Sequence, residues 1–187
     1  MSDKIDWYVS SLDDRALFIG RFQPFHLGHL DLLKRILKDF REVTVGVGSS
    51  QYSHVLENPF TFSERHEMIQ RTLEAEGVDG WQVIPIPDVD IHSQWVTHLL
   101  SRVPPFQAVF SHEPLTRQLF QDAGIRVLEK PLLNRDKLSG TEIRRRILEG
   151  GNWRELLPSH VAEFIEEIDG VARVKAVASS ESHQAQQ

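Results

Sequence analysis

The chain has 187 residues, a length that supports one domain with a sizeable hydrophobic core. Hydrophobic residues make up 40% and charged residues 26%, as in an ordinary globular protein, and the formal net charge of −6 argues against general nucleic-acid binding. Cysteine is absent, which excludes disulfides, a thiol nucleophile and zinc–thiolate sites. No apolar run approaches the ~20 residues that a membrane span needs.

The first element expected in the chain is a buried strand at 16–20, preceded by a short extension. Residues 1–14 are polar and acidic and lack the basic start and apolar centre of a signal peptide, so we interpret them as an N-terminal extension of a cytoplasmic protein. The continuously apolar run 16–20 is typical of a central strand in a parallel sheet.

The stretch after this strand carries the strongest functional signal, Gly20-Arg21-Phe22-Gln23-Pro24-Phe25-His26-Leu27-Gly28-His29-Leu30. It leads into an amphipathic helix expected at 29–40, and the unpaired N–H groups and partial positive charge of a helix start attract phosphate. Gly28 lets a phosphate approach the backbone. His26 and His29, three residues apart, can both donate to phosphoryl oxygens.

The alternative for these histidines is an ordinary polar role beside a turn. Their pairing around a glycine at a strand-to-helix turn favours a phosphate site. The stretch matches neither the P-loop pattern nor the Gly-rich dinucleotide fingerprint.

Strands and helices are expected to alternate through the middle of the chain. The second strand, at 43–47, ends in Gly48-Ser49-Ser50, small residues at the carboxyl edge where open parallel sheets bind ligands. Thr61 and Glu64 match a capping box that opens a helix running to 76. The remaining expected elements are strands at 81–86, 108–110 and 126–128 and helices at 94–102 and 114–122.

A second phosphate-binding pattern stands at Ser139-Gly140-Thr141-Glu142-Ile143-Arg144, followed by two more arginines. One interpretation is a well-capped helix with a basic solvated face. The other is that backbone N–H groups and the Thr141 hydroxyl hold phosphate oxygens while Arg144, one turn into the helix, adds a forked charged contact. The three successive arginines cannot all face one ligand, because neighbouring helical residues point about 100° apart.

The pattern as a whole predicts an α/β fold with a mostly parallel five-stranded sheet, helices on both faces and a C-terminal helical segment. We expect a single domain at 15–175 with a last helix at 159–168. The Ser/Gln-rich residues 176–187 are expected to be a disordered tail.

The motif His26-Leu27-Gly28-His29 resembles the His-x-Gly-His signature of the nucleotidyltransferase superfamily. The longer string that contains it resembles archaeal-type nicotinamide mononucleotide (NMN) adenylyltransferases, and Ser139-Gly140-Thr141 with Arg144 resembles the second superfamily signature. The resemblance spans 16–174 and implies a Rossmann-like nucleotidyltransferase fold. It implies that AMP is transferred from ATP to NMN to give NAD and pyrophosphate.

The same resemblance assigns residues to the two substrates. His26, His29, Arg21 and Arg144 are implied to be catalytic by holding the phosphates and stabilising charge on the transferring group. The implied ATP-binding residues are Gly20, Arg21, Phe22, Gln23, His26, Gly28, His29, Ser139, Gly140, Thr141 and Arg144. The implied NMN-binding residues are Gly48, Ser49, Asp88, His92 and Trp95, with Trp95 stacking on the nicotinamide ring; without the family, Trp95 is an ordinary core aromatic.

Two stretches depart from the family pattern. His92 stands where an asparagine is common, and Ser111-His112-Glu113-Pro114 replaces the usual Ser-Gly-Asn-Pro. Other acceptors, such as nicotinic acid mononucleotide, flavin mononucleotide or phosphopantetheine, and a cytidylyltransferase activity therefore stay as alternatives. A non-catalytic nucleotide sensor is an alternative of another class, against which the presence of both histidines and Arg144 argues. The family further implies Mg²⁺ held mainly by ATP phosphates without a protein metal site, and a homo-hexamer.

Overall fold

A computed structural model describes residues 14–89, 91–131, 133 and 137–184. Of the expected N-terminal extension, 1–13 lie outside the described residues. The chain divides into two compact units, each assembled from three separate stretches. The first unit takes 1–20, 33–48 and 80–131, and the second takes 21–32, 49–79 and 132–187.

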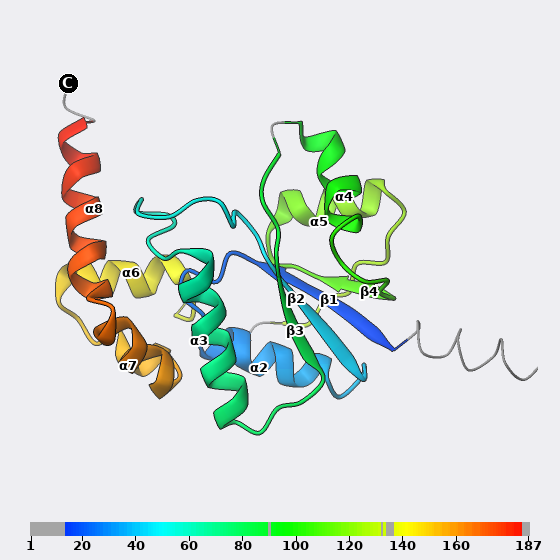
Figure 1. Cartoon of the computed structure of the whole chain (residues 1–187), viewed down its shortest axis with the longest axis horizontal. Coiled ribbons are helices and arrows are strands. Elements are labelled where there is room, and N and C mark those ends of the chain that lie inside the picture. Colours follow the sequence, from blue (N-terminus) through cyan, green and yellow to red (C-terminus); the bar gives the residue numbers. More distant parts are fainter. Residues whose placement is uncertain (1–13, 90, 132, 134–136, 185–187) are drawn as a thin grey trace, which may run out of the picture. The chain divides into compact units, whose positions relative to one another are not determined.

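The first unit is built on a parallel sheet. Its strands run in the order β3-β2-β1-β4, and each neighbouring pair is parallel, which confirms the predicted sheet type (Figure 1). The central pair is in register over its full length, with Gly20 at the end of one strand opposite Val47 of the other. The strands are β1 (Arg15–Gly20), β2 (Glu42–Val47), β3 (Trp81–Pro85) and β4 (Ala108–Phe110).

The predicted fifth strand is the one incorrect strand among the described residues. In place of a strand at 126–128, Val127 makes a single parallel bridge with Val109. The partner strand β4 has only three residues, so few backbone groups are available for pairing. The chain beyond Leu128 continues as Glu129-Lys130-Pro131, and proline cannot donate a backbone hydrogen bond to a sheet.

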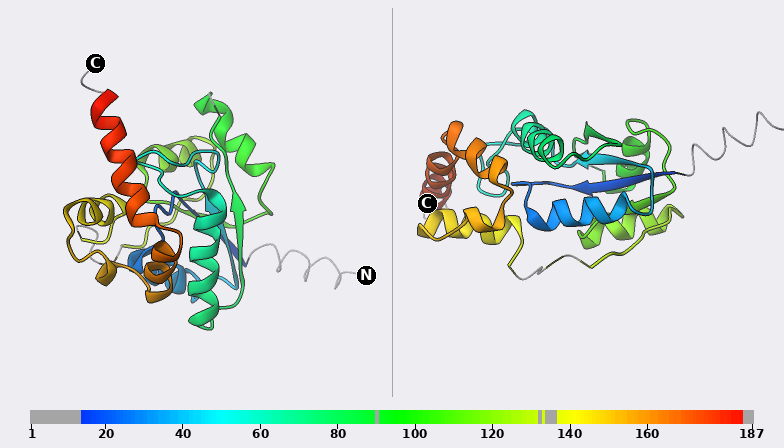
Figure 2. Two further views of the ribbon diagram at one scale, coloured as in Figure 1. Left: turned by 60° about the vertical axis from the view of Figure 1, so that its left-hand side comes forward. Right: turned by 90° about the horizontal axis from the view of Figure 1, so that it is seen from below.

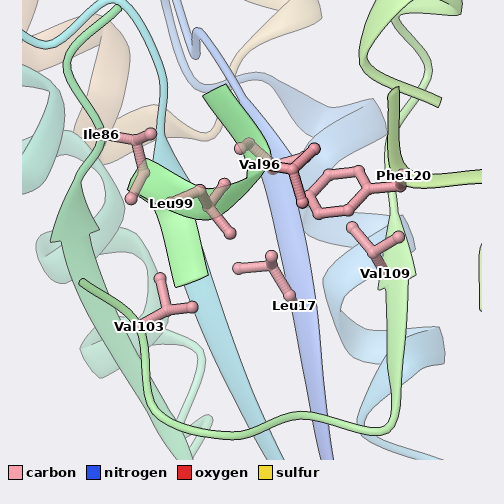
Figure 3. Close-up of a cluster of buried hydrophobic side chains, with 8 residues drawn as sticks. Leu17, Ile86, Val96, Leu99, Val103, Val109 and Phe120 are labelled. Atoms are coloured by element: carbon pink, nitrogen blue, oxygen red, sulfur yellow. The ribbon is translucent and has the colours of Figure 1, made fainter. Parts of the chain in front are cut away.

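One face of this sheet is covered by α4 (His92–Leu100) and α5 (Pro114–Asp122). Alternate residues of β1 point to this face, and Leu17 packs there with Leu99 and Phe120 in a buried apolar cluster (Figure 3). The cluster members are Leu17, Ile19, Ile86, Val96, Leu99, Val103, Val109 and Phe120.

The last turn of α2 (Leu27–Ile36) belongs to this unit and covers the opposite face of the sheet. Phe110 alternates with Val109 and therefore points to this second face, where its ring meets that of Phe40 edge-on at 5.9 Å. Helices on both faces account for the continuously apolar strands, as the sequence predicted.

The second unit is helical. It contains α3 (Phe62–Ala75), α6 (Gly140–Glu149), the 3-10 turn η1 (Arg154–Leu156), α7 (Ser159–Glu167) and α8 (Gly170–Gln184). α7 packs on α3, and α8 packs on both α6 and α7 (Figure 2). The predicted capping box of α3 is present, with Thr61 and Glu64 bonding each other's backbone N–H. Every helix of the described residues is too short or too polar to span a lipid bilayer.

Helix α8 corrects the expectation of a disordered tail from 176, because the helix continues to Gln184, and only 185–187 lie outside the described residues. Near its start the helix is anchored by the fully buried Val174, its fifth residue. A helix that is already nucleated extends at little further cost. Farther along, the Glu181 carboxylate accepts a bond of 2.7 Å from the backbone N–H of Leu56.

Candidate active site

The turn after β1 carries the first group of candidate residues, and from Arg21 onward it belongs to the second unit. Phe22 and Phe25 are buried, and their ring centroids lie 4.8 and 5.5 Å from that of His29. Helix α2 begins at Leu27, two residues earlier than predicted. The His26 carbonyl accepts a 2.9 Å bond from the N–H of His29, so both histidines lie at the first turn, where helix N–H groups gather.

The two histidines form a stacked pair that bonds to its own backbone. Their ring centroids are 3.5 Å apart, with 19° between the planes. The N–H of His29 donates to Nδ1 of His26 over 3.3 Å, and the N–H of His26 donates to Nδ1 of His29 over 3.2 Å. Because an accepting Nδ1 carries no proton, each neutral ring holds its proton on Nε2. An Nε2–H is a suitable donor for a phosphoryl oxygen.

Gly28 lies close against this pair. A Cβ at this position would lie 3.1 Å from Nδ1 of His26 and 3.4 Å from the Cβ of Leu138. A side chain there would press on the ring that accepts the His29 N–H. The glycine therefore serves the geometry of the histidines, in addition to the open backbone that the sequence suggested.

Gln23 fastens the turn to the segment that enters α3. Its side chain is buried, its Nε2 donates to the Phe60 carbonyl over 2.9 Å, and its Oε1 accepts from the Phe60 N–H over 3.0 Å. The carboxamide is thus engaged with Phe60. Gln23 therefore holds the turn in place, and the contact with ATP that the resemblance implied for it stays a prediction.

The second phosphate motif forms the start of α6. Ser139 is the N-cap, and its hydroxyl accepts from the N–H of Glu142 over 3.1 Å. The spacing of Ser139 and Glu142 also matches a capping box, but only the serine half of it forms, because the Glu142 carboxylate accepts from Arg145 and Arg146 over 2.8 Å each. These bonds lower the pKa of Glu142 to about 2.

Arg144 differs from the two arginines that follow it. Arg145 pairs with Glu142 and Glu149, whereas the buried Arg144 donates from Nη1 to the backbone carbonyl of Gln23 over 2.7 Å. Burial, followed by the nearby positive charge of Arg21, lowers the pKa of Arg144 to about 10. The guanidinium is still charged at neutral pH, and an anion placed there would offset both effects.

Arg144 also joins the two motifs, although they are far apart in the sequence. Its bond to Gln23 links α6 to the turn that follows β1. Gly140 permits this approach, because a Cβ there would lie 2.8 Å from the Gln23 carbonyl oxygen and 3.0 Å from Nη1 of Arg144. By the bounds of the two units, all the predicted ATP-binding residues except Gly20 belong to the second unit.

Arg21 is half-exposed and pairs with a carboxylate that the sequence did not suggest. Its Nη1 lies 3.3 Å from Oε2 of Glu57, in the loop before α3. Glu57 also acts on Arg144, since its negative charge is the one influence that raises the pKa of that guanidinium. A carboxylate thus stands beside two of the predicted phosphate ligands. No sequence pattern marks Glu57 for this place.

The predicted NMN-binding residues lie in the first unit, apart from Ser49. Gly48 follows β2, and its N–H donates to the carbonyl of Gly20 over 2.9 Å. Asp88 is exposed in the loop after β3, and His92 is the first residue of α4. Trp95 is half-buried on α4, and its ring meets that of Phe120 edge-on at 5.7 Å.

The turn that departs from the family pattern has structural bonds of its own. Glu113 caps α5 by accepting the N–H of Thr116 over 2.5 Å, and its own N–H donates to the Ser111 hydroxyl over 3.3 Å. Nε2 of His112 lies 3.1 Å from the Lys130 carbonyl oxygen. Local bonds of the first unit thus account for both residues.

Comparison with known proteins decides the family. Residues 17–146 match the model of the family described as cytidylyltransferase-like. The nicotinamide-nucleotide adenylyltransferase of Thermoplasma volcanium is 45% identical over 172 residues, which cover 92% of this chain and 97% of that protein. The enzyme of the same name from Methanolobus tindarius is 48% identical over 167 residues, covering 89% and 96%. The chain belongs to the nicotinamide-nucleotide adenylyltransferase family.

Solved structures support the fold. A bifunctional NMN adenylyltransferase/ADP ribose pyrophosphatase from Francisella tularensis superposes with a TM-score of 0.72 at 21% identity, over 94% of this chain and 57% of that one. The same bifunctional protein complexed with AMP and a manganese ion gives 0.69 at 18% identity. The chain spans a little over half the length of that protein. At these identities the likeness shows the Rossmann-like nucleotidyltransferase fold.

Proposed function

We propose that this enzyme transfers AMP from ATP to NMN, giving NAD and pyrophosphate, and that the second unit binds the ATP phosphates. As a member of its family the chain is a nucleotidyltransferase. The observation that carries the site assignment is the His26–His29 pair at the start of α2, joined through Gln23 to Arg144. Two helix starts, two imidazoles and a buried guanidinium are donors suited to a polyphosphate.

In the proposed reaction an oxygen of the NMN 5′-phosphate attacks the α-phosphorus of ATP in line. The bond from the α-phosphorus to the bridging oxygen of the β-phosphate breaks, and pyrophosphate leaves with that electron pair. The Nε2–H groups of His26 and His29 donate to phosphoryl oxygens, while Arg144 and Arg21 offset the charge on the leaving pyrophosphate. The protein positions the reactants and forms no covalent intermediate.

We propose that Mg²⁺ enters with ATP, held chiefly by phosphate oxygens and water. In the part of the chain that the structure describes, no group of three or more His, Cys, Asp or Glu side chains could hold a metal ion. The proposal requires no such group, because the ion neutralises the polyphosphate as part of the substrate.

The acceptor is tested by incubating the protein with ATP and Mg²⁺ and one of four acceptors: NMN, nicotinic acid mononucleotide, flavin mononucleotide or phosphopantetheine. Pyrophosphate release and the adenylylated product are measured for each. We expect NAD from NMN as the fastest product. Faster reaction with another acceptor would overturn NMN as the substrate and leave the phosphate site standing, whereas no pyrophosphate from any acceptor would favour a nucleotide sensor.

The role proposed for Trp95 is to stack on the nicotinamide ring. We expect Trp95→Ala to raise KM for NMN about tenfold or more and KM for ATP much less, since base–aromatic stacking contributes about 1–3 kcal/mol. Steady-state kinetics with each substrate varied in turn measures the two constants. Phe106→Ala is the matched control, because Phe106 also packs edge-on against Phe120 in the same unit. If Trp95→Ala raises KM for NMN and KM for ATP equally, and Phe106→Ala does the same, Trp95 is a core residue and does not stack on the nicotinamide ring.

Glu57 is expected to compete with ATP for Arg21. We expect Glu57→Gln to lower KM for ATP about two- to fivefold, because an exposed ion pair is worth at most about 1 kcal/mol. KM is measured at saturating NMN in low and high salt, and the difference should shrink in high salt. Glu181→Gln is the control, since Glu181 holds the same loop at Leu56 without pairing with Arg21. A higher KM in Glu57→Gln would contradict competition.

Assembly and location stay predictions. The family resemblance implies a homo-hexamer, and the N-terminal sequence, which does not resemble a signal peptide, predicts a cytoplasmic protein. Light scattering of the purified protein at several concentrations measures the assembly.

A further inference from the structure

Arg65 is a fully buried arginine that serves three backbone carbonyls. It lies in the first turn of α3 with 0% of its surface exposed. Its Nε donates to the Thr61 carbonyl over 3.2 Å, its Nη1 to the Arg21 carbonyl over 2.9 Å, and its Nη2 to the Ser49 carbonyl over 3.2 Å. All four residues belong to the second unit. One side chain thus ties α3 to the turn after β1 and to the turn after β2.

Both turns contain a non-glycine residue in the left-handed backbone region. The φ angles are +51° at Phe22 and +48° at Ser49. Such conformations cost about 1–3 kcal/mol each and persist only where the surroundings hold them. The Arg21 carbonyl belongs to the peptide group that precedes Phe22, and the Ser49 carbonyl belongs to Ser49 itself. Arg65 therefore bonds to the peptide groups beside both strained residues.

These two turns carry residues of the proposed site. Arg21 is one of its phosphate ligands, and the Phe22 ring meets His29 at 4.8 Å, so a shift of this peptide would displace the Arg21 side chain and loosen the histidine pair. Ser49 was predicted to lie beside the NMN. A displacement of about 1 Å in such groups is enough to lower a rate about 100-fold.

We infer that Arg65 is a positioning residue, which holds the strained turns at 21–22 and 49 in the geometry that adenylyl transfer requires. This inference rests on the proposed function. A planar guanidinium presents its donors in a fixed fork, and that fork spans three carbonyls. A lysine ammonium at the same place is a single point and cannot keep all three bonds.

The test compares Arg65→Lys with Arg173→Lys. Arg173 is the matched control because its Nη1 donates to Glu64 over 2.7 Å and its guanidinium contacts the Pro59 and Ile168 carbonyls, so it braces α3 and α8 and does not serve these turns. Melting temperature, kcat, KM for ATP and the melting-temperature rise with inorganic tripolyphosphate are measured for both variants. Kinetics are run at a temperature where circular dichroism shows both folded.

We expect both variants to melt at a lower temperature than the wild type. Only Arg65→Lys should lose about 10- to 100-fold in kcat/KM for ATP and most of the melting-temperature rise caused by tripolyphosphate. Equal kinetics in the two variants would overturn the inference. An inactive wild-type protein would instead overturn the proposed function. Arg65→Gln, which keeps a donor and removes the buried charge, is the second variant and should show the same kinetic loss. If neither Arg65 variant folds, the residue serves folding alone and the inferred positioning role is overturned.

Discussion

Replacing His29 with alanine is expected to lower kcat by at least about 100-fold, on the scale of removing one preorganised donor from a transition state. The substitution removes the Nε2–H proposed to bind a phosphoryl oxygen, and it also removes the Nδ1 that accepts the His26 N–H. The measurement is pyrophosphate release at saturating ATP and NMN. Circular dichroism and melting temperature are recorded alongside to show that the fold is intact.

The control for this variant is His160→Ala, at an exposed histidine of α7 in the same unit, which should leave kcat unchanged. The mutual bonds between His26 and His29 add a second expectation. Because each ring orients the other, His26→Ala combined with His29→Ala should cost less than the product of the two single losses. A near-normal kcat in folded His29→Ala would remove the residue from the proposed chemistry.

Features that depend on neighbours in the sequence could be predicted. The capping box at Thr61 and Glu64 needs only a spacing of three residues, and both of its bonds are present. Strand β1 follows from an apolar run, and the parallel sheet follows from the alternation of strands and helices. The start of α2 at Leu27 departs by two residues from the expectation, in line with the ordinary uncertainty of helix ends.

Features that depend on distant partners could not be predicted. The bidentate pairing of Gln23 with Phe60 joins residues far apart in the chain, and no local pattern indicates it. The same holds for Arg65, whose capping-box neighbourhood suggests only a helix start. The Ser-rich composition of helix α8 resembles a disordered segment, whereas burial of Val174 fixes the start of the helix.

The choice among the three arginines of α6 shows where sequence reasoning needed the family. Angular spacing indicated that the three could not all face one ligand, and the family resemblance selected Arg144. The structure adds a physical reason, since Arg145 and Arg146 are both engaged by carboxylates and Arg144 donates to a backbone carbonyl. A buried guanidinium whose charged form is disfavoured by its surroundings is a suitable partner for a polyphosphate.

Arg144→Gln is therefore expected to lower kcat/KM for ATP about 10- to 150-fold, because a charge-assisted hydrogen bond contributes about 1.5–3 kcal/mol. The shorter glutamine side chain does not extend to the position of Nη1, so the substitution removes the bond to the Gln23 carbonyl together with a buried positive charge near Arg21, and the two losses have opposite effects on stability. The melting temperature should consequently change by only a few degrees or rise, since uncompensated buried charge is destabilising. Kinetics and thermal unfolding are measured on the same preparation.

Arg145→Gln is the control one position along the helix. It removes exposed ion pairs with Glu142 and Glu149, so it should leave kcat/KM unchanged. Inorganic tripolyphosphate separates binding from catalysis, because it should raise the melting temperature of the wild type and of Arg145→Gln and have little effect on Arg144→Gln. Equal stabilisation of all three proteins would place the polyphosphate elsewhere. The buried arginine would then be a structural link between α6 and the turn at Gln23.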